Sequence, residues 1–116
     1  MRVLVLVKAT GSSEAGEHPE PWTSAMMDAM GRFNDELRSA GVFVMAAGLE
    51  PSSAGKRLLC GDAERREVDG PFSPTSDVVA GFWIWEVPSM DVAMDWARRC
   101  PDPMPTPSWI EIRPMH

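Results

Sequence analysis

The segment Val68-Asp69-Gly70-Pro71-Phe72 holds the first candidate for chemistry, the carboxylate of Asp69. In such a turn Asp69 can cap backbone N–H groups, Gly70 can adopt a positive φ, and Pro71 fixes φ at about −65°. A carboxylate held rigidly in this way is suited to proton transfer. Asx-type turns are common and catalytic aspartates are rare, so a structural cap is favoured, with catalysis as the alternative.

A second charged pair, Glu111 and Arg113, stands in a strand-like segment that begins at Trp109. Alternation along a strand places all three side chains on one face. A carboxylate between tryptophans would have a raised pKa and could move protons, with Arg113 holding an anion. The simpler interpretation is an ion pair at the rim of an interface. The predicted cleft is lined by Trp22, Asp69, Phe72, Trp83, Trp85 and Trp109.

Other kinds of active site are disfavoured. The sequence contains no P-loop, GxGxxG, GxSxG or CxxC motif. His18 lies in a polar loop and His116 is the last residue, so both are expected to be exposed bystanders. Cys100 ends a predicted helix, where the helix dipole raises a thiol pKa and disfavours a nucleophile. We therefore expect no metal, no cofactor and no histidine-driven acid–base catalysis.

Length and composition predict one domain over residues 1–116, with a single hydrophobic core. The net charge of −6 and the lack of a basic stripe argue against a nucleic-acid partner. The apolar segment Val3–Val7 is too short to cross a membrane. With no secretory leader recognised, Cys60 and Cys100 are expected to be free thiols in a cytoplasmic protein.

Hydrophobic periodicity predicts the strands that would carry these groups. Short apolar or alternating segments indicate strands at Val3–Val7, Val42–Ala47, Phe82–Val87 and Trp109–Arg113. The charged stretch Lys56–Val68 is predicted to form an exposed hairpin with its tip at Gly61–Glu64. One helical turn is expected within Ser73–Asp77.

Two helices are predicted between the strands. An apolar stripe at steps of three and four marks the first helix, which Thr23 or Ser24 would cap and Gly41 would end. Ser89 would cap the second helix and Pro101 would stop it. The stretch Gly11–Pro19 is expected to be a loop. The stripe of the first helix consists of Trp22, Met26, Met30, Phe33 and Leu37.

The strands and helices together predict an α+β fold whose two helices cover only one face of the sheet. However, Val3–Val7 and Phe82–Val87 are apolar on both faces. The second face is therefore expected to be covered by an identical face of another copy. In this homodimer Trp83 and Trp85 would lie between the subunits.

The turn Asp69–Phe72 spells DGPF, and it is accompanied by further motif segments along nearly the whole chain. In this order they resemble the YCII-related family, in particular its DGPF-motif branch. The resemblance implies a ferredoxin-like fold with an antiparallel sheet, which dimerises face to face into an α/β barrel. The accompanying segments are Val7–Thr10, Ser13–Gly16, Phe33–Leu37, Gly48–Ser52, Ala80–Trp85 and Arg99–Pro101.

The resemblance does not supply a catalytic pair. Founding YCII-type proteins are thought to use a histidine and an aspartate, whose positions fall here near Thr23–Ala25 and at Cys100. Two functions therefore stay open. One is a small-molecule site, catalytic or not, in a dimer cleft. The other is a non-catalytic accessory protein in transcription regulation, since relatives are often encoded beside sigma factors of the extracytoplasmic-function type.

Overall fold

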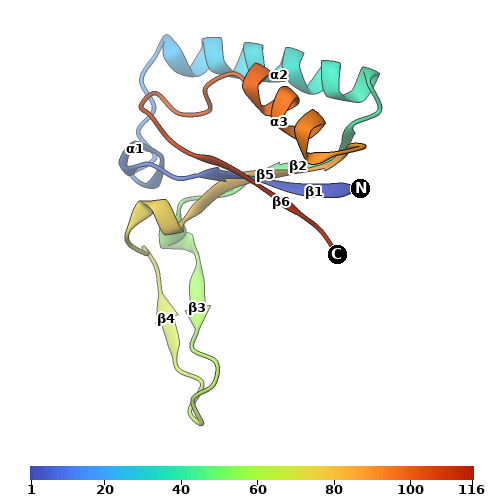
Figure 1. Cartoon of the computed structure of the whole chain (residues 1–116). Coiled ribbons are helices and arrows are strands. Elements are labelled where there is room, and N and C mark those ends of the chain that lie inside the picture. The colour runs from blue at the N-terminus through green and yellow to red at the C-terminus, as the bar shows by residue number, and fades with distance from the viewer.

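A computed structural model describes all residues, 1–116, as a layer of helices on an antiparallel sheet with a projecting hairpin (Figure 1). The sheet has the strand order β2-β5-β1-β6, and β3 and β4 form a separate two-stranded sheet. The elements are β1 (Arg2–Lys8), α1 (Gly11–Glu14), α2 (Trp22–Ser39), β2 (Phe43–Gly48), η1 (Ser52–Ala54), β3 (Lys56–Leu58), β4 (Glu67–Asp69), η2 (Thr75–Asp77), β5 (Val79–Glu86), α3 (Met90–Arg99) and β6 (Ile110–Pro114).

The four-stranded sheet is built around β1, which pairs antiparallel with β5 and β6. Val5 lies opposite Trp83 on one side and Ile112 on the other, so alternate residues of three strands share one face. Helices α2 and α3 lie on this face, which we call the covered face (Figure 1). The element order and sheet order together are those of the predicted ferredoxin-like α+β fold.

The two tryptophans of β5 lie on the covered face and form the centre of the core. Trp83 is 5% exposed and Trp85 is fully buried. The ring of Phe33 in α2 meets both edge-on, with centroid distances of 6.1 Å to Trp83 and 6.3 Å to Trp85. The prediction that these tryptophans lie between subunits is therefore wrong. The gap between helices and sheet needs large side chains to reach interior packing density, and the indoles fill it.

The opposite face of the sheet, which we call the open face, is apolar at its middle. In the antiparallel pairing of β1 with β5, Leu4 lies opposite Ile84 and Leu6 lies opposite Phe82. These four side chains are half-buried, and no helix covers them. The prediction of strands with two apolar faces is thus confirmed. However, the helices cover the face that carries Trp83 and Trp85, and the uncovered face is the one that carries Phe82 and Ile84.

The predicted helix ends are partly correct. Helix α2 begins at Trp22 without a side-chain cap, so the capping roles expected of Thr23 and Ser24 are wrong. Instead the Glu20 carboxylate accepts hydrogen bonds from the amide and hydroxyl of Ser24, at 3.3 Å and 2.9 Å. Gly41, with φ of +73°, follows the helix as predicted. Ser89 caps α3 by accepting the amide of Val92.

The segment predicted as a loop after β1 contains the short helix α1. Thr10 accepts the backbone N–H of Ser13, and the Ser13 hydroxyl oxygen accepts that of Thr10, which makes a capping box. The polar composition of this segment is typical of a loop. However, the reciprocal hydrogen bonds between Thr10 and Ser13 close one helical turn. The turn fixes the direction of Glu14.

The hairpin Lys56–Asp69, which we call the arm, extends away from the body on the side opposite the helices (Figure 1). The predicted hairpin is confirmed, and every residue from Lys56 to Asp69 is exposed. The helical turn predicted before β5 is present as η2. The arm makes a two-stranded sheet that shares no hydrogen-bonded strand with the body.

Candidate functional site

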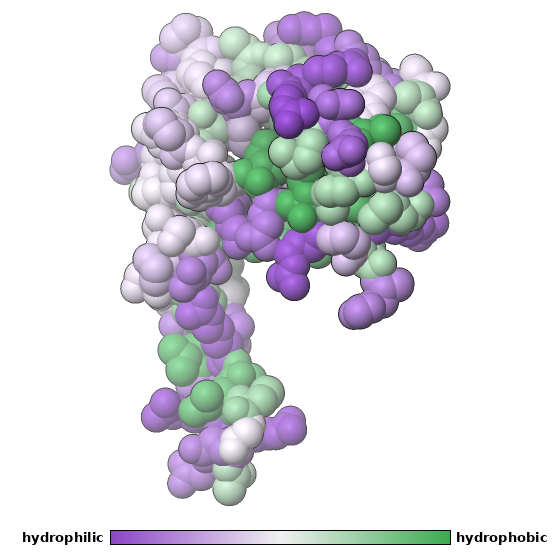
Figure 2. Space-filling view, viewed as in Figure 1, coloured by the Kyte–Doolittle hydropathy of each residue, from purple (hydrophilic) through white to green (hydrophobic).

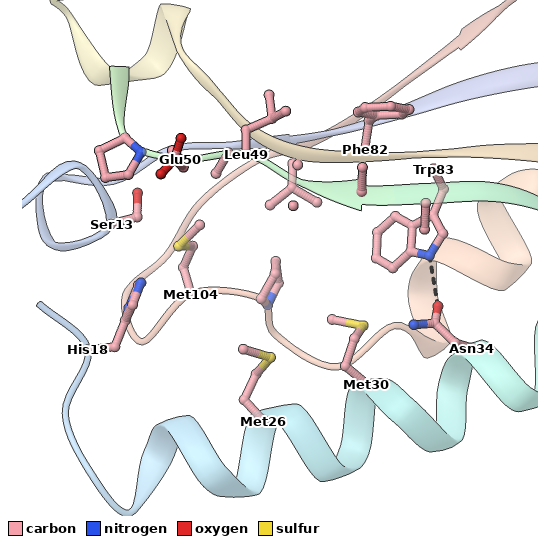
Figure 3. Close-up of a pocket in the computed structure, with 18 of the residues that line it drawn as sticks. Ser13, His18, Met26, Met30, Asn34, Leu49, Glu50, Phe82, Trp83 and Met104 are labelled. Carbon is pink, nitrogen blue, oxygen red and sulfur yellow. Dashed lines mark hydrogen bonds between the residues drawn. The ribbon is translucent and has the colours of Figure 1, made fainter. Parts of the chain in front are cut away.

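A cleft of about 660 Å³ opens between α2 and the sheet, close to the free edge of β2 (Figure 3). Its volume lies within the range of small-molecule sites. Half of its 22 lining residues are hydrophobic. The cleft is formed within one copy of the chain.

One wall of the cleft is a stripe of α2 in which every fourth residue takes part. Met26, Met30, Asn34 and Arg38 line the cleft, whereas Phe33 and Leu37 turn into the core. Residues four apart share a helix face, so one helix supplies two adjacent stripes with different tasks. Met26 and Met30 give this wall an apolar surface that can adapt its shape.

A hydrogen bond in the cleft joins α2 to β5. The indole N–H of Trp83 donates a 2.8 Å hydrogen bond to Oδ1 of Asn34. Because the oxygen and the NH2 group are opposite branches of one amide, this bond directs the NH2 group into the cleft (Figure 3). The NH2 group donates no hydrogen bond within the chain, so it is available to an acceptor.

Arg38, one helical turn after Asn34, places a cation on the same wall of the cleft. The guanidinium of Arg38 sits 4.3 Å from the ring centroid of Phe43 and 3.1 Å from the carboxylate of Asp35. Both contacts are at the surface, where an arginine exchanges partners easily. Asn34 and Arg38 thus make one end of the cleft suitable for an acceptor or anionic group.

The other end of the cleft contains His18 and Glu50. The imidazole of His18 stacks on Trp22, with 5.7 Å between ring centroids, and it points into the cleft (Figure 3). His18 is exposed, as predicted, but it lines the candidate site rather than lying apart from it. Neither Glu14 nor Glu50 forms a hydrogen bond or ion pair with it, so the histidine lacks a carboxylate partner.

A network beside this end ties three of the motif segments together. The Glu14 carboxylate accepts the backbone N–H of Ser52 at 2.8 Å and also binds the Ser52 hydroxyl. The same hydroxyl oxygen accepts the backbone N–H of Phe72 at 2.9 Å. Ser52 is buried, and the network joins α1, η1 and the DGPF turn.

This network corrects the role expected of the turn. Ser52, not Asp69, satisfies the turn's backbone N–H. Gly70 has no positive φ. It is required because a Cβ there would lie 1.8 Å from the carbonyl oxygen of Ser52. Asp69 points to solvent and pairs with Lys56 across the arm at 2.8 Å, so its predicted capping role is wrong.

The structure does not bring the predicted site residues together. Of the six residues expected in the cleft, only Trp83 lines it, and Trp22 stacks on the lining residue His18. Trp85 is inside the core, and Phe72 packs under the guanidinium of Arg57 at the base of the arm. Trp109 is 75% exposed.

Glu111 is half-buried beside β1, between Lys8 at 3.7 Å and Arg113 at 3.8 Å. The ion pair predicted from alternation is confirmed, on the open face rather than in the cleft. The catalytic roles considered for Asp69, Glu111 and Arg113 stay predictions. Their separation from the cleft favours structural roles.

The cysteines are free thiols in different surroundings. Cys60 is exposed on the arm. Burial, and secondarily the carboxylate of Asp102, raises the pKa of the Cys100 thiol to about 12. The predicted direction is correct, but the cause is desolvation rather than the helix dipole. No three His, Cys, Asp or Glu side chains form a group that could hold a metal ion, and no helix has the length and apolarity to span a membrane.

Several site residues were missed from the sequence. Asn34 and Arg38 could have been found as the polar members of the step-of-four series that starts at Met26. Ser52 and Glu14 stood in motif segments without an assigned task. Their contact joins residues 38 positions apart, which no local pattern reports.

Comparisons with known proteins agree with this architecture. An uncharacterised protein from Rhizobium meliloti (strain 1021) is 33% identical over 76 residues, which cover 66% of this chain. The match spans 61% of that protein's own length, less than two thirds. The family model of the YCII-related domain matches residues 1–115. The chain therefore belongs to the YCII-related domain family.

Proposed function

We propose that the protein binds a small organic molecule in the cleft between α2 and the sheet. The ligand has a mainly apolar body and carries a hydrogen-bond acceptor, such as a carboxylate, at one end. The observation that carries this proposal is the Asn34 NH2 group, which Trp83 directs into the cleft and which has no partner in the chain. Apolar clefts with a few fixed polar groups are typical of such sites.

The apolar body of the ligand would contact the methionines of the cleft. Met26 and Met30 from α2 face Met104 from the loop before β6 (Figure 3). Thioethers offer contact area without a fixed shape. Binding is better supported than acid–base turnover, because His18 lacks the carboxylate that would orient it.

The experiment has two parts. Native mass spectrometry of freshly purified protein would detect a ligand that co-purifies. Titration with decanoate and with the uncharged decanol would then test the acceptor end. We expect decanoate to bind more tightly than decanol, and Asn34→Leu to remove most of that difference.

A matched pair of variants tests the position of the site. Met26 lines the cleft, whereas the next residue, Met27, is 64% exposed. Met26→Lys should weaken decanoate binding by at least about tenfold, which corresponds to the loss of about 1.4 kcal/mol. Met27→Lys should leave it unchanged. Equal effects of the two variants, or no preference for decanoate, would contradict the proposal.

We also propose that the protein is a homodimer that associates through its open face. The support is the apolar strip of Leu4, Leu6, Phe82 and Ile84, which no element of the chain covers. Ile84→Lys should convert the dimer to a folded monomer in light scattering. A wild-type protein that is monomeric at tens of micromolar would refute the dimer.

The second candidate function is that of an accessory protein in transcription regulation beside a sigma factor. The observation that favours it is the exposed arm, which is suited to contact another protein. A protein that binds no small molecule in its cleft and forms no dimer would favour this candidate over the first.

A further inference from the structure

The arm exposes apolar side chains that nothing in its own chain covers. Leu58, Leu59 and Val68 are 48%, 43% and 43% exposed, and Figure 2 shows hydrophobic residues gathered on the arm. A two-stranded hairpin without further packing is only marginally stable in water. The arm therefore needs a surface against which these side chains can pack.

The direction of the arm indicates where that surface lies. The helices lie above the sheet in Figure 1, and the arm extends below it, on the side of the open face. A smaller hollow of about 390 Å³ lies at the base of the arm, between Phe72, Arg57 and Val79 of β5. Any molecule bound on the open face therefore lies beside the arm.

The charges of these two surfaces favour a second copy of this chain. On the open face Arg2 pairs with Glu86, and Glu111 lies between Lys8 and Arg113. On the arm four cationic side chains are balanced by four anionic ones. The chain as a whole carries −6, so its acidic excess lies elsewhere. The acidic excess of two copies therefore does not meet when they approach through this surface.

We propose that the arm of each copy clasps the second copy when the two associate through their open faces. Leu58, Leu59 and Val68 pack against apolar side chains of the other copy, and the symmetry of the pair repeats the contact twice. The clasp rests on the proposed homodimer and adds that the arm is a main source of its affinity.

Cys60 allows a direct test, because it is the exposed thiol of the arm, whereas Cys100 is half-buried and burial raises the pKa of its thiol. The full-length protein is labelled at Cys60 with benzophenone maleimide, mixed with ¹⁵N-labelled protein and irradiated. We expect crosslinked peptides that join the arm of one isotope to the open-face strands β1 or β6 of the other. Crosslinks confined to one isotope in a dimeric sample would overturn the clasp.

A second measurement compares matched charge changes. The arm variant is the double substitution Leu58→Glu and Leu59→Glu. The helix variant is the double substitution Met27→Glu and Met94→Glu, at exposed residues of α2 and α3. The arm variant should raise the dimer dissociation constant at least about tenfold, while the helix variant keeps the wild-type value. Equal constants for the two variants would overturn the clasp and leave the dimer standing. A monomeric wild type, in place of a particle of twice 12.8 kDa, would refute both.

Discussion

The two faces of the sheet come from the same strands but have different partners. On the covered face Trp83 and Trp85 lie under α2 and α3, where Phe33 also contacts Trp96 at 6.3 Å between centroids. On the open face Phe82 and Ile84, their neighbours in sequence, are only half-buried. The number of apolar faces of a strand thus tells how many partners the strand needs, but not which partner each face receives.

The difference lies in the volume that each face must fill. Helices stand about 10 Å from a sheet, and indole rings fill that space better than leucines. The aromatic residues of the helices, Phe33 and Trp96, are the complement of the tryptophans on β5. The open face carries Leu4, Leu6, Phe82 and Ile84, which are smaller than indole rings, with ion pairs at its edges.

The largest expected effect distinguishes the two faces directly. Trp85→Ala leaves a cavity in the fully buried core and should lower the free energy of unfolding by about 3–5 kcal/mol. Ile84→Ala on the open face should cost less, and under the proposed homodimer its cost should fall when the protein is diluted below the dimer dissociation constant. Urea unfolding at two protein concentrations measures both. A larger loss for Ile84→Ala at low concentration would reverse the assignment of the faces.

Much of the fold could be predicted because its signals are local. A continuous apolar run marked β1, alternation marked β5, the stripe ending at Leu37 marked α2, and Gly41 marked its end. The face taken by the helices depends instead on contacts such as Phe33 with Trp83, 50 positions apart in the sequence. Composition likewise misread α1, because Thr10 and Ser13 bond to each other rather than to solvent.

A substitution in the joint between body and arm should lower the free energy of unfolding more than a substitution in the arm itself. Ser52→Ala leaves the Phe72 N–H without its acceptor and the Glu14 carboxylate without one donor, at a cost of about 1–3 kcal/mol. Asp69→Ala removes only an exposed ion pair with Lys56 and should cost about 0–1 kcal/mol. Thermal and urea unfolding of the two variants would compare them. A loss at Asp69 equal to that at Ser52 would restore the capping role to the aspartate.

A smaller effect separates the two tryptophans within the covered face. The N–H of Trp83 is bonded to Asn34, whereas the buried N–H of Trp85 has no hydrogen-bond partner. Both Trp→Phe changes remove similar volume. Trp83→Phe also leaves Asn34 Oδ1 without its donor, while Trp85→Phe removes an unsatisfied group. The first should therefore be more destabilising by about 1 kcal/mol, and Asn34→Leu in the Trp83→Phe background should recover part of the loss.

The candidate site was less predictable than the fold. Trp83 was included in the predicted cleft. The other cleft groups lie on α2, on the loop that precedes α2 and on the segment that follows β2, and only folding brings these together. Asp69 and Phe72 drew notice because their turn is a sequence motif. Their turn is instead held by Ser52 and Glu14, whose contact cannot be read from spacing. Motif residues can mark a structural joint as readily as a catalytic group.

The smallest expected effect concerns the two thiols, one in the body and one on the arm. The pKa of Cys100 is about 12 in the folded protein against 9.0 ordinarily. Well below pH 9.0 both states hold a neutral thiol, so Cys100 adds no pH dependence to stability there. Above it the unfolded chain releases the proton first, and stability falls as pH rises toward 12. At about pH 9.5 the loss should be under about 1 kcal/mol.

Substitution of each thiol separates this contribution from those of other groups that ionise at high pH. Cys100→Ala should flatten the decline of unfolding free energy between pH 9 and 10, even if it lowers stability at neutral pH by opening space beside the core. Cys60→Ala should leave the decline as in the wild type, because Cys60 is exposed on the arm. Parallel curves for wild type and Cys100→Ala would mean that the thiol is hydrated in the folded state. That result would place Cys100 with the exposed surface rather than with the interior.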